Sequence, residues 1–329
     1  MNNFIRNFSL FYISALLCLA PMTSHAAGER THKQITGGSK YKTVNYKSGS
    51  RKIQHRIRAH KAVAVDRYDG STPLKLASTK ALVINQSTGE VLYAKNTDVT
   101  TPIASVTKLM TAMVMLDASL PLDELVAITD EDVDYLKGTR SRLSVGTVLT
   151  RGELLHLALM ASENRAASAL GRYYPGGKPA FVQAMNSKAR LLGMQSTHFV
   201  DSTGLDSNNV STAEDLVKMV NAAYHYPEIR QVTTSPSQEI TLYGRQRPLN
   251  FVNTNALVRG GNWEIGLSKT GFINEAGRCL VMQAEISGQP TIIVLLDSVG
   301  KMTRIGDANR IRKWVEHNDM NSLGEHVDG

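Results

Sequence analysis

The segment TPIASVTKLMTAMVML, residues 101–116, joins a short polar start to a long apolar run. Pro102 stands where a first helical turn is expected, because proline is favoured there. We therefore predict a buried helix that begins near this proline. Ser105 and Lys108 are three residues apart at its start, so their side chains share one face. A desolvated, neutral lysine can serve as the base for a serine hydroxyl, and the helix amino terminus favours negative charge near Ser105.

The Ser-x-x-Lys spacing is weak evidence alone, because it occurs three times in this chain. Ser39 and Lys42 lie in a basic segment that has little apolar periodicity. Ser298 and Lys301 follow directly on a strand-like apolar run, which is a poor context for a helix. Only the Ser105 copy lies at a predicted helix start.

Two further motifs follow in sequence order. Ser162-Glu-Asn164 comes after a run with apolar residues at helical spacing, and Lys269-Thr-Gly271 lies in a predicted strand. A second Ser-x-Asn occurs at 207–209, in a predicted loop, so each fragment means little by itself. The signal is the ordered set of three motifs, each in its fitting context.

The rest of the pattern predicts an α+β fold with strands at both ends and helices between them. KALVINQSTGEVLYAKN, residues 80–96, reads as two strands joined by a turn, and 102–226 is mostly helical in pattern. Within it Ser211 and Glu214 form a predicted capping box. Three strands (267–272, 279–286 and 290–298) and a closing helix (306–317) follow. We expect a domain over 76–320 and a polar tail over 321–329.

The first 26 residues resemble a secretory signal, with Arg6, an apolar stretch over 8–20 and a small-residue cleavage site at 24–26. We therefore expect an exported, periplasmic protein, soluble or loosely bound to membrane. The mature chain keeps one cysteine, Cys279, so no intrachain disulfide is expected.

Residues 27–75 are predicted to form a flexible basic leader. Within it, residues 28–70 hold eleven Lys or Arg against three acids. Because the chain carries a formal charge of +8 and Arg6 adds one more, the remainder carries about −1. Two interpretations stay open: the leader holds anionic wall polymer or a membrane surface, or it is a solvated linker. Nucleic acid is not expected as a partner, because aromatic residues are sparse in the leader.

The chain resembles the low-molecular-mass penicillin-binding proteins, serine peptidases of the D-Ala-D-Ala type, whose motif triple it carries. The resemblance runs over about 81–314 and is greatest to the D-alanyl-D-alanine endopeptidase members. It includes the segments PIASVTKLMTAMVMLDASLPLDE, LALMASENRAASAL, YPGGKPAFVQAMNSKARLLGM, TGLDSNNVSTAEDL and SKTGFINEAGRCLVM. Such long collinear agreement is far more specific than a three-residue motif.

The resemblance implies the penicilloyl serine transferase (β-lactamase-like) fold, a five-stranded antiparallel sheet flanked by terminal helices, with a mostly helical insertion. It also implies roles for the motif residues. Ser105 would form an acyl-enzyme and Lys108 would accept its proton. Ser162 would relay a proton, and Asn164 would hold the amide of the acyl chain.

The resemblance implies a carboxylate-binding role for the third motif. Lys269 and Thr270 would meet the substrate carboxylate, with Gly271 completing the motif. The backbone N–H groups of Ser105 and Phe272 would form the oxyanion hole. Arg304 would be the carboxylate-binding arginine that some relatives carry. No cofactor or metal is implied.

Charge and burial give further expectations around this site. Lys108, Lys269 and Arg304 would crowd positive charge into one cleft, which favours a neutral lysine. Glu163 is expected to be structural, since the serine and asparagine beside it take the family roles. Cys279 is expected to be a buried strand residue and not a nucleophile, because no motif supplies a basic partner.

The expected substrate is the D-alanyl-meso-diaminopimelate cross-link of peptidoglycan, with β-lactam antibiotics as covalent inhibitors. A DD-carboxypeptidase is the alternative, although only 58 residues follow Gly271, too few for the second β-domain of many carboxypeptidases. A β-lactamase is less favoured, because no Glu-x-x-Leu-Asn loop lies between the second and third motifs. A non-catalytic wall-binding protein remains the alternative of another class.

Overall fold

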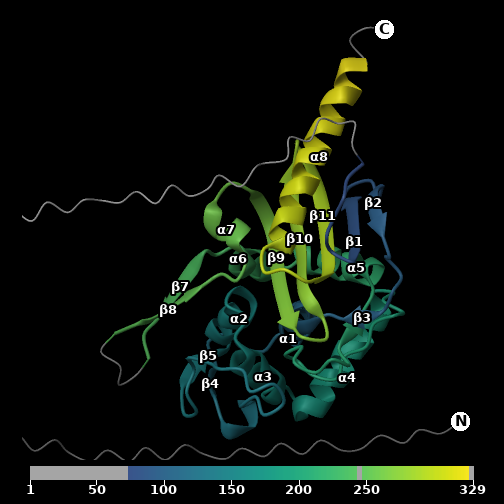
Figure 1. The fold of residues 1–329 in the computed structure, drawn as a ribbon. Helices are drawn as coiled ribbons and strands as arrows, with labels where there is room; N and C mark the ends of the chain where they lie inside the picture. The colour runs from purple at the N-terminus through teal and green to yellow at the C-terminus, as the bar shows by residue number, and fades with distance from the viewer. Residues whose placement is uncertain (1–72, 243–246, 326–329) are drawn as a thin grey trace, which may run out of the picture. The chain divides into compact units, whose positions relative to one another are not determined.

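The computed structural model describes residues 73–242 and 247–325, and its centre is a five-stranded sheet (Figure 1). The strands lie in the order β2-β1-β11-β10-β9, and every neighbouring pair is antiparallel. Their bounds are β1 (Lys80–Asn85), β2 (Val91–Lys95), β9 (Glu264–Ile273), β10 (Gly277–Ile286) and β11 (Gln289–Ser298). The predicted α+β class, the first hairpin and the three late strands are confirmed.

The mostly helical insertion between β2 and β9 is also confirmed. Its helices are η1 (Ala104–Thr107), α1 (Lys108–Asp117), η2 (Asp130–Asp132), α2 (Arg151–Met160), α3 (Asn164–Arg172), α4 (Gly177–Leu191), α5 (Ala213–Tyr224), α6 (Pro227–Thr233) and α7 (Ala256–Gly260). Three short antiparallel ribbons pair β3 (Thr101–Pro102) with β6 (Val210–Ser211), β4 (Leu125–Ala127) with β5 (Val148–Thr150), and β7 (Ser237–Ile240) with β8 (Leu249–Val252).

The sheet is buried on both faces, which explains the continuous apolar runs of its central strands. On β11, Ile293 and Leu295 belong to a core shared with Ala308 and Ile311 of α8 (Thr303–Glu325). The alternate β11 residues, Ile292 and Val294 among them, belong to the larger core that the helical insertion supplies. α8 contacts β10 and β11 on one face, and α5 contacts the same strands from the other.

Helix α1 forms the centre of the larger core. Eight of its ten residues, from Lys108 to Met115, are buried, as expected for an apolar helix surrounded by other elements. The Thr111 hydroxyl donates to the Ser202 carbonyl at 2.7 Å, which satisfies the polar group that the helix buries. The predicted buried helix is therefore confirmed, and Ser105 and Lys108 are anchored at its start.

The predicted start of that helix is wrong in detail. Pro102 lies in β3, paired with Val210, and not in a first helical turn. Ile103 precedes the 3-10 turn η1, which contains Ser105, and α1 begins only at Lys108. A proline fits this two-stranded ribbon because an edge strand has positions where no backbone N–H has to be donated to a neighbour.

The predicted capping box of α5 is also wrong by one residue. The N-cap is Thr212, whose hydroxyl accepts from the Asp215 backbone N–H at 3.2 Å. Glu214 instead accepts a hydrogen bond from the Thr97 hydroxyl at 2.7 Å. Ser211 pairs with Thr101 in the β3–β6 ribbon, so its backbone is extended before the helix begins.

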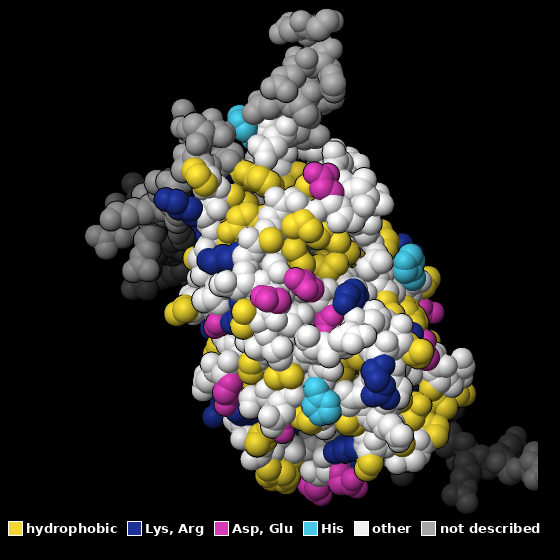
Figure 2. Space-filling view, turned by 90° about the vertical axis from the view of Figure 1, so that its right-hand side faces the viewer, with side chains coloured by type: hydrophobic (Ala, Val, Ile, Leu, Met, Phe, Trp, Pro, Cys, Tyr) yellow, Lys and Arg dark blue, Asp and Glu magenta, His cyan; other side chains and the backbone are white. Residues whose placement is uncertain are grey.

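The domain boundaries are only partly covered by the described residues. The expected signal (1–26), nearly all of the leader (27–75) and any helix before the sheet lie outside them. α8 is the expected C-terminal helix, and it continues to Glu325 instead of ending near residue 317. Among the described helices, none combines the length and apolar content that crossing a bilayer requires. On the face seen in Figure 2, acidic and basic side chains are interspersed, as expected for a nearly neutral domain.

Candidate active site

The structure brings Ser105 and Lys108 into direct contact. Lys108 Nζ lies 2.8 Å from Ser105 Oγ, 2.7 Å from Asn164 Oδ1 and 2.6 Å from the Thr203 carbonyl oxygen. An amide oxygen and a carbonyl oxygen can only accept. A neutral amine has two N–H groups, which these two acceptors take, and its remaining lone pair then faces the Ser105 hydroxyl.

Burial supplies the neutral form. The Lys108 side chain is fully buried, and this desolvation lowers its pKa to about 7, with Asp201 and Glu163 opposing the shift. At neutral pH a substantial fraction of Lys108 therefore lacks its extra proton. A lysine in water has an ordinary pKa of about 10.4 and is almost entirely protonated at this pH.

The second motif lies at a break that the sequence pattern does not reveal. Apolar residues at helical spacing run through 152–174, but α2 ends at Met160 and α3 begins at Asn164. Between them Ser162 has φ +60°, a backbone conformation that only glycine adopts easily. Ala104, beside the nucleophile candidate, also has a positive φ, +48°. Strained backbone of this kind clusters at functional sites.

The third motif supplies a second buried lysine. Lys269, on β9, donates to Ser162 Oγ and to the Thr270 carbonyl, both at 2.9 Å. Burial lowers the pKa of Lys269 well below its usual value, and the neighbouring Lys108 and Arg304 lower it further. The expected crowding of positive charge is therefore present. Lys269 connects the second motif to the third across the space between helices and sheet.

Gly271 allows β9 to lie against the turn that carries Ser105. A Cβ atom at this position would lie 2.9 Å from the Ile103 carbonyl oxygen and 3.1 Å from the Ser105 backbone nitrogen. The oxyanion hole expected from the resemblance would use the backbone N–H of Ser105 and that of Phe272, the next residue along β9. Its ring is half exposed, with the Arg278 guanidinium 4.4 Å from the ring centroid.

Arg304 lies in the first turn of α8, close enough to influence Lys269. Its Nε and Nη1 atoms are buried and have no hydrogen-bond partner among the described residues. Burial lowers the pKa of the guanidinium, with Arg278 adding to the effect. A partly buried cation with free donors is suited to an anionic group such as a carboxylate.

Several site residues were missed by the sequence analysis. Thr203 contributes a backbone carbonyl, for which no sequence letter is diagnostic. Thr254 accepts from the Thr270 hydroxyl at 2.6 Å, and Thr139 accepts from Asn164 Nδ2 at 2.9 Å. Asn164 is thus held between Lys108 and Thr139.

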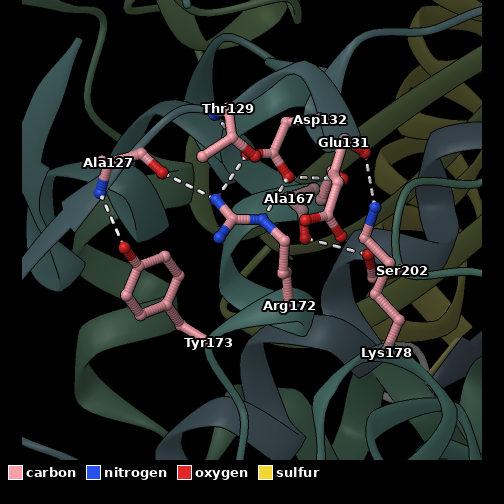
Figure 3. Close-up of polar contacts among 10 residues, drawn as sticks. Ala127, Thr129, Glu131, Asp132, Ala167, Arg172, Tyr173, Lys178 and Ser202 are labelled. Carbon is pink, nitrogen blue, oxygen red and sulfur yellow. Dashed lines mark hydrogen bonds and ion pairs between the residues drawn. The ribbon is translucent and has the colours of Figure 1, made fainter. Parts of the chain in front are cut away.

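The segment that presents the Thr203 carbonyl is fixed by hydrogen bonds. Asp201 accepts from the backbone N–H groups of Thr203 and Gly204, at 2.5 and 2.6 Å. Ser202 donates its hydroxyl to the Ala167 carbonyl of α3 at 2.9 Å (Figure 3). The same helix begins at Asn164, so both acceptors of Lys108 belong to one connected unit.

A second cluster ties α3 to the segment that leads into the loop over 133–146. Buried Asp132 accepts from the Arg172 guanidinium, with a shortest distance of 2.7 Å, and from the Ser168 hydroxyl at 2.9 Å. Figure 3 shows Arg172 lying between Asp132 and Ala127, whose carbonyl it also reaches. The carboxylate also caps the Thr129 backbone N–H at 3.0 Å. This is an internally satisfied ion pair, as buried charges require.

Glu163 has a structural contact, and Cys279 is a buried strand residue, as the sequence predicted. The Glu163 carboxylate accepts from the Ser141 hydroxyl at 2.6 Å and so faces the loop over 133–146. Cys279 is fully buried in β10, opposite Gly271. Burial raises the pKa of its thiol to about 11, so it stays protonated, and the thiolate is the nucleophilic form.

The other copies of the motifs lie away from this arrangement or outside the described residues. Ser39 and Lys42 are outside them. The Ser298 hydroxyl pairs with that of Ser78 at 2.7 Å. Asn209, from the second Ser-x-Asn, is buried, and its side-chain oxygen accepts from the Val200 backbone N–H. This is a structural role in the segment between α4 and β6.

The chain is similar to known proteins over most of its length. A family model described as D-alanyl-D-alanine carboxypeptidase matches residues 56–300. D-alanyl-D-alanine endopeptidase of Pseudomonas aeruginosa is 49% identical over 249 residues, which cover 76% of this chain and 80% of that protein. The Escherichia coli protein of the same name is 47% identical over 242 residues, 74% of this chain and 78% of its own.

More distant relatives carry other names. A D-alanyl-D-alanine carboxypeptidase of Streptomyces sp. strain K15 is 32% identical over 254 residues, covering 73% of this chain and 87% of its own. The crystal structure of the Streptomyces K15 DD-transpeptidase is similar with a TM-score of 0.69 and 31% identity, covering 74% of this chain and 98% of that one. The fold implied by the sequence resemblance is therefore confirmed.

Proposed function

Since the chain belongs to the D-alanyl-D-alanine carboxypeptidase family of serine peptidases, we propose that it hydrolyses D-alanyl-meso-diaminopimelate cross-links of peptidoglycan through an acyl-enzyme on Ser105. The single observation that carries the assignment of the nucleophile is the 2.8 Å contact between Ser105 Oγ and the buried Nζ of Lys108. A serine hydroxyl needs a neighbouring base to become nucleophilic, and this lysine has its lone pair available.

Acylation begins when neutral Lys108 takes the Ser105 hydroxyl proton. Oγ then attacks the carbonyl carbon of the D-alanyl residue, and the carbonyl oxygen gains negative charge. The N–H groups of Ser105 and Phe272 stabilise that oxyanion, each by about 3–4 kcal/mol in comparable sites. The C–N bond breaks, the amine takes a proton relayed from Lys108 through Ser162, and the acyl group stays on Oγ.

Hydrolysis completes the cycle. A water gives a proton to Lys108 and attacks the ester carbonyl, the ester C–O bond breaks, and Ser105 recovers its proton. Lys269, Thr270 and Arg304 bind the carboxylate of the substrate: the Arg304 guanidinium has buried donors without a partner among the described residues, and Lys269 and Thr270 add an amine and a hydroxyl. A β-lactam carries a comparable carboxylate and acylates the same serine, which makes such compounds covalent inhibitors.

The endopeptidase activity is favoured over the carboxypeptidase activity by the two relatives at 49% and 47% identity, both named endopeptidases. The alternative, removal of a terminal D-Ala, uses the same acylation and is the named activity of the 32% identical relative. Only the amine that leaves differs between these reactions: diaminopimelate of a second stem in one, free D-alanine in the other.

Two assays test this function. Wild-type protein should be labelled covalently by a fluorescent penicillin, and Ser105→Ala should not be. Purified enzyme should then be incubated with cross-linked muropeptide dimers and with pentapeptide monomers. Cleaved dimers support the endopeptidase; loss of terminal D-Ala from monomers with dimers intact would replace it by the carboxypeptidase. An unlabelled wild type would leave the non-catalytic wall-binding alternative.

The same proposal includes export to the periplasm, supported by the signal-like first 26 residues, and wall or membrane contact through the basic leader over 27–75. Cell fractionation tests the compartment. Sedimentation of the protein with purified walls at low and high salt tests the leader, because screening weakens such contacts. Binding that does not change with salt would contradict an electrostatic leader.

A further inference from the structure

A chain of hydrogen bonds leads from an exposed loop to the candidate base. Thr139 Oγ1 donates to Asp134 Oδ2 at 2.6 Å, and Asn164 Nδ2 donates to Thr139 Oγ1 at 2.9 Å. The other end of the same amide, Asn164 Oδ1, accepts from Lys108 Nζ at 2.7 Å. We propose that Asp134 and Thr139 are positioning residues that fix the orientation of the Asn164 amide and thereby aim the Lys108 lone pair at Ser105. This inference rests on the proposed function.

The direction of the chain follows from what each group can donate. Burial raises the pKa of Asp134, but the hydrogen bonds from the Thr139 hydroxyl and from the backbone N–H groups of Lys137, Thr139 and Leu136 together lower it below its usual value, so the carboxylate only accepts. Thr139 has a single hydroxyl hydrogen, and Asp134 takes it. Toward Asn164 the hydroxyl can therefore only accept, which selects the NH₂ end of the amide.

The orientation of the Asn164 amide determines which partner is left for the lone pair of Lys108. With its NH₂ end turned to Thr139, Asn164 presents only its oxygen to Lys108. The Thr203 carbonyl is the other acceptor on Lys108. In the neutral amine both N–H groups are then used, and Ser105 is the partner left for the lone pair. If the amide were reversed, its NH₂ group would compete with Ser105 for that lone pair.

Hydrogen bonds and an ion pair hold the loop over 133–146 in place. Asp134 also accepts from the backbone N–H groups of Leu136 and Lys137, both at 2.9 Å. Lys137 forms an ion pair with Glu275 of the turn between β9 and β10, at 2.5 Å. Glu163 holds the Ser141 hydroxyl further along the loop. The loop is thus attached both to the sheet and to the segment that precedes α3.

The test compares Thr139→Val, which removes the hydroxyl at nearly constant shape, with Thr139→Ser, which restores it. Thr139 is exposed, so valine is accommodated. The matched control is Thr88→Val, an exposed threonine between β1 and β2, at the opposite edge of the sheet from β9. The measurement is the second-order rate constant for acylation by a fluorescent penicillin between pH 5 and 9, with thermal unfolding of each variant.

Two changes are expected together for Thr139→Val. The high-pH plateau falls about tenfold, because the lone pair is no longer aimed at Ser105. The acid limb moves to lower pH, because an Asn164 amide that is no longer held by Thr139 turns its oxygen away from Lys108. That oxygen is an acceptor that favours the ammonium form of Lys108. The other charges that face Lys108, which are Asp201, Glu163 and Lys269, are unchanged. Thr139→Ser and Thr88→Val should match the wild type.

The outcomes separate this inference from the proposed function. A Thr139→Val protein with the plateau and acid limb of Thr88→Val would overturn the positioning role. A lower plateau with an unmoved acid limb, or one that serine does not rescue, would show a structural role only and overturn it as well. An unlabelled wild type would remove the proposed function, and this inference with it.

Discussion

Gly271 of β9 lies so close to the Ile103 carbonyl oxygen that a Cβ atom on residue 271 would stand 2.9 Å from it. Contacts that short are not tolerated, so a side chain here must push the strand away from the turn that carries Ser105. The close approach of β9 to the backbone of Ile103 and Ser105 therefore depends on the absence of a side chain at residue 271.

Replacing this glycine tests the close approach. Gly271→Ala should lower penicillin acylation by about 10²–10³-fold, the loss typical of a disrupted oxyanion hole. Gly260→Ala is the control, because a Cβ atom there meets nothing within 4 Å. Labelling rates and thermal unfolding of both variants provide the comparison. Equal labelling of the two would mean that β9 and the turn do not need this contact.

The acylation rate should depend on pH through Lys108. The base acts in its neutral form, and its pKa is about 7, so the rate should rise as pH increases through 7 and fall below it. Lys108→Arg, whose guanidinium keeps its proton, should lose about 10²–10⁴-fold at every pH. Rates of penicillin acylation from pH 5 to 9 measure both. A rate that is constant between pH 5 and 8 would contradict a lysine base.

Arg304 should recognise a carboxylate. Arg304→Met should slow acylation by penicillin by about 10–100-fold, the range for a lost hydrogen bond to a charged group. Against a penicillin whose carboxylate is esterified, the variant and the wild type should react alike. Arg312→Met, further along α8, is the control for loss of a surface ion pair. An equal loss against both compounds would point to misfolding of the helix start.

The buried pair of Asp132 and Arg172 should matter for stability more than for chemistry. Asp132→Ala leaves a largely buried guanidinium unpaired and should cost about 3–5 kcal/mol in urea unfolding. Adding Arg172→Met should recover part of that loss. The surface pair of Asp117 and Lys188 is the comparison, and Asp117→Ala should cost about 0–1 kcal/mol. Similar losses for both aspartates would argue that burial of the pair is unimportant.

The motif residues and the fold class could be predicted because each depends on local pattern. Ser105 and Lys108 are three apart at the start of an apolar helix, and Lys269 lies in an apolar strand. The resemblance then implied the roles of the motif residues, and the related solved structure confirmed the fold. What remained hidden was set by tertiary contact. The helical pattern around Ser162 gave no sign of its left-handed backbone.

The errors have the same origin. Pro102 suits a helix start by local preference, yet pairing with Val210 places it in a ribbon. Ser211 and Glu214 have capping-box spacing, but the same ribbon extends the backbone past Ser211 and moves the cap to Thr212. The Thr203 carbonyl belongs to the backbone, which every residue possesses, so no pattern of side chains could identify it.

The topology of the sheet has a consequence for how the enzyme is made. β1 pairs with β11, so Lys80 meets Leu296 across more than 200 residues of intervening chain. Contacts of such separation form late, since a long loop must close before they contribute free energy. Lys269 lies on β9, which reaches the sheet only through β10 and β11. We therefore expect a chain that ends before β11 to contain Ser105, Lys108 and Lys269 without the complete sheet that holds Lys269 against Ser162, so that peptidase activity requires the C-terminal strands.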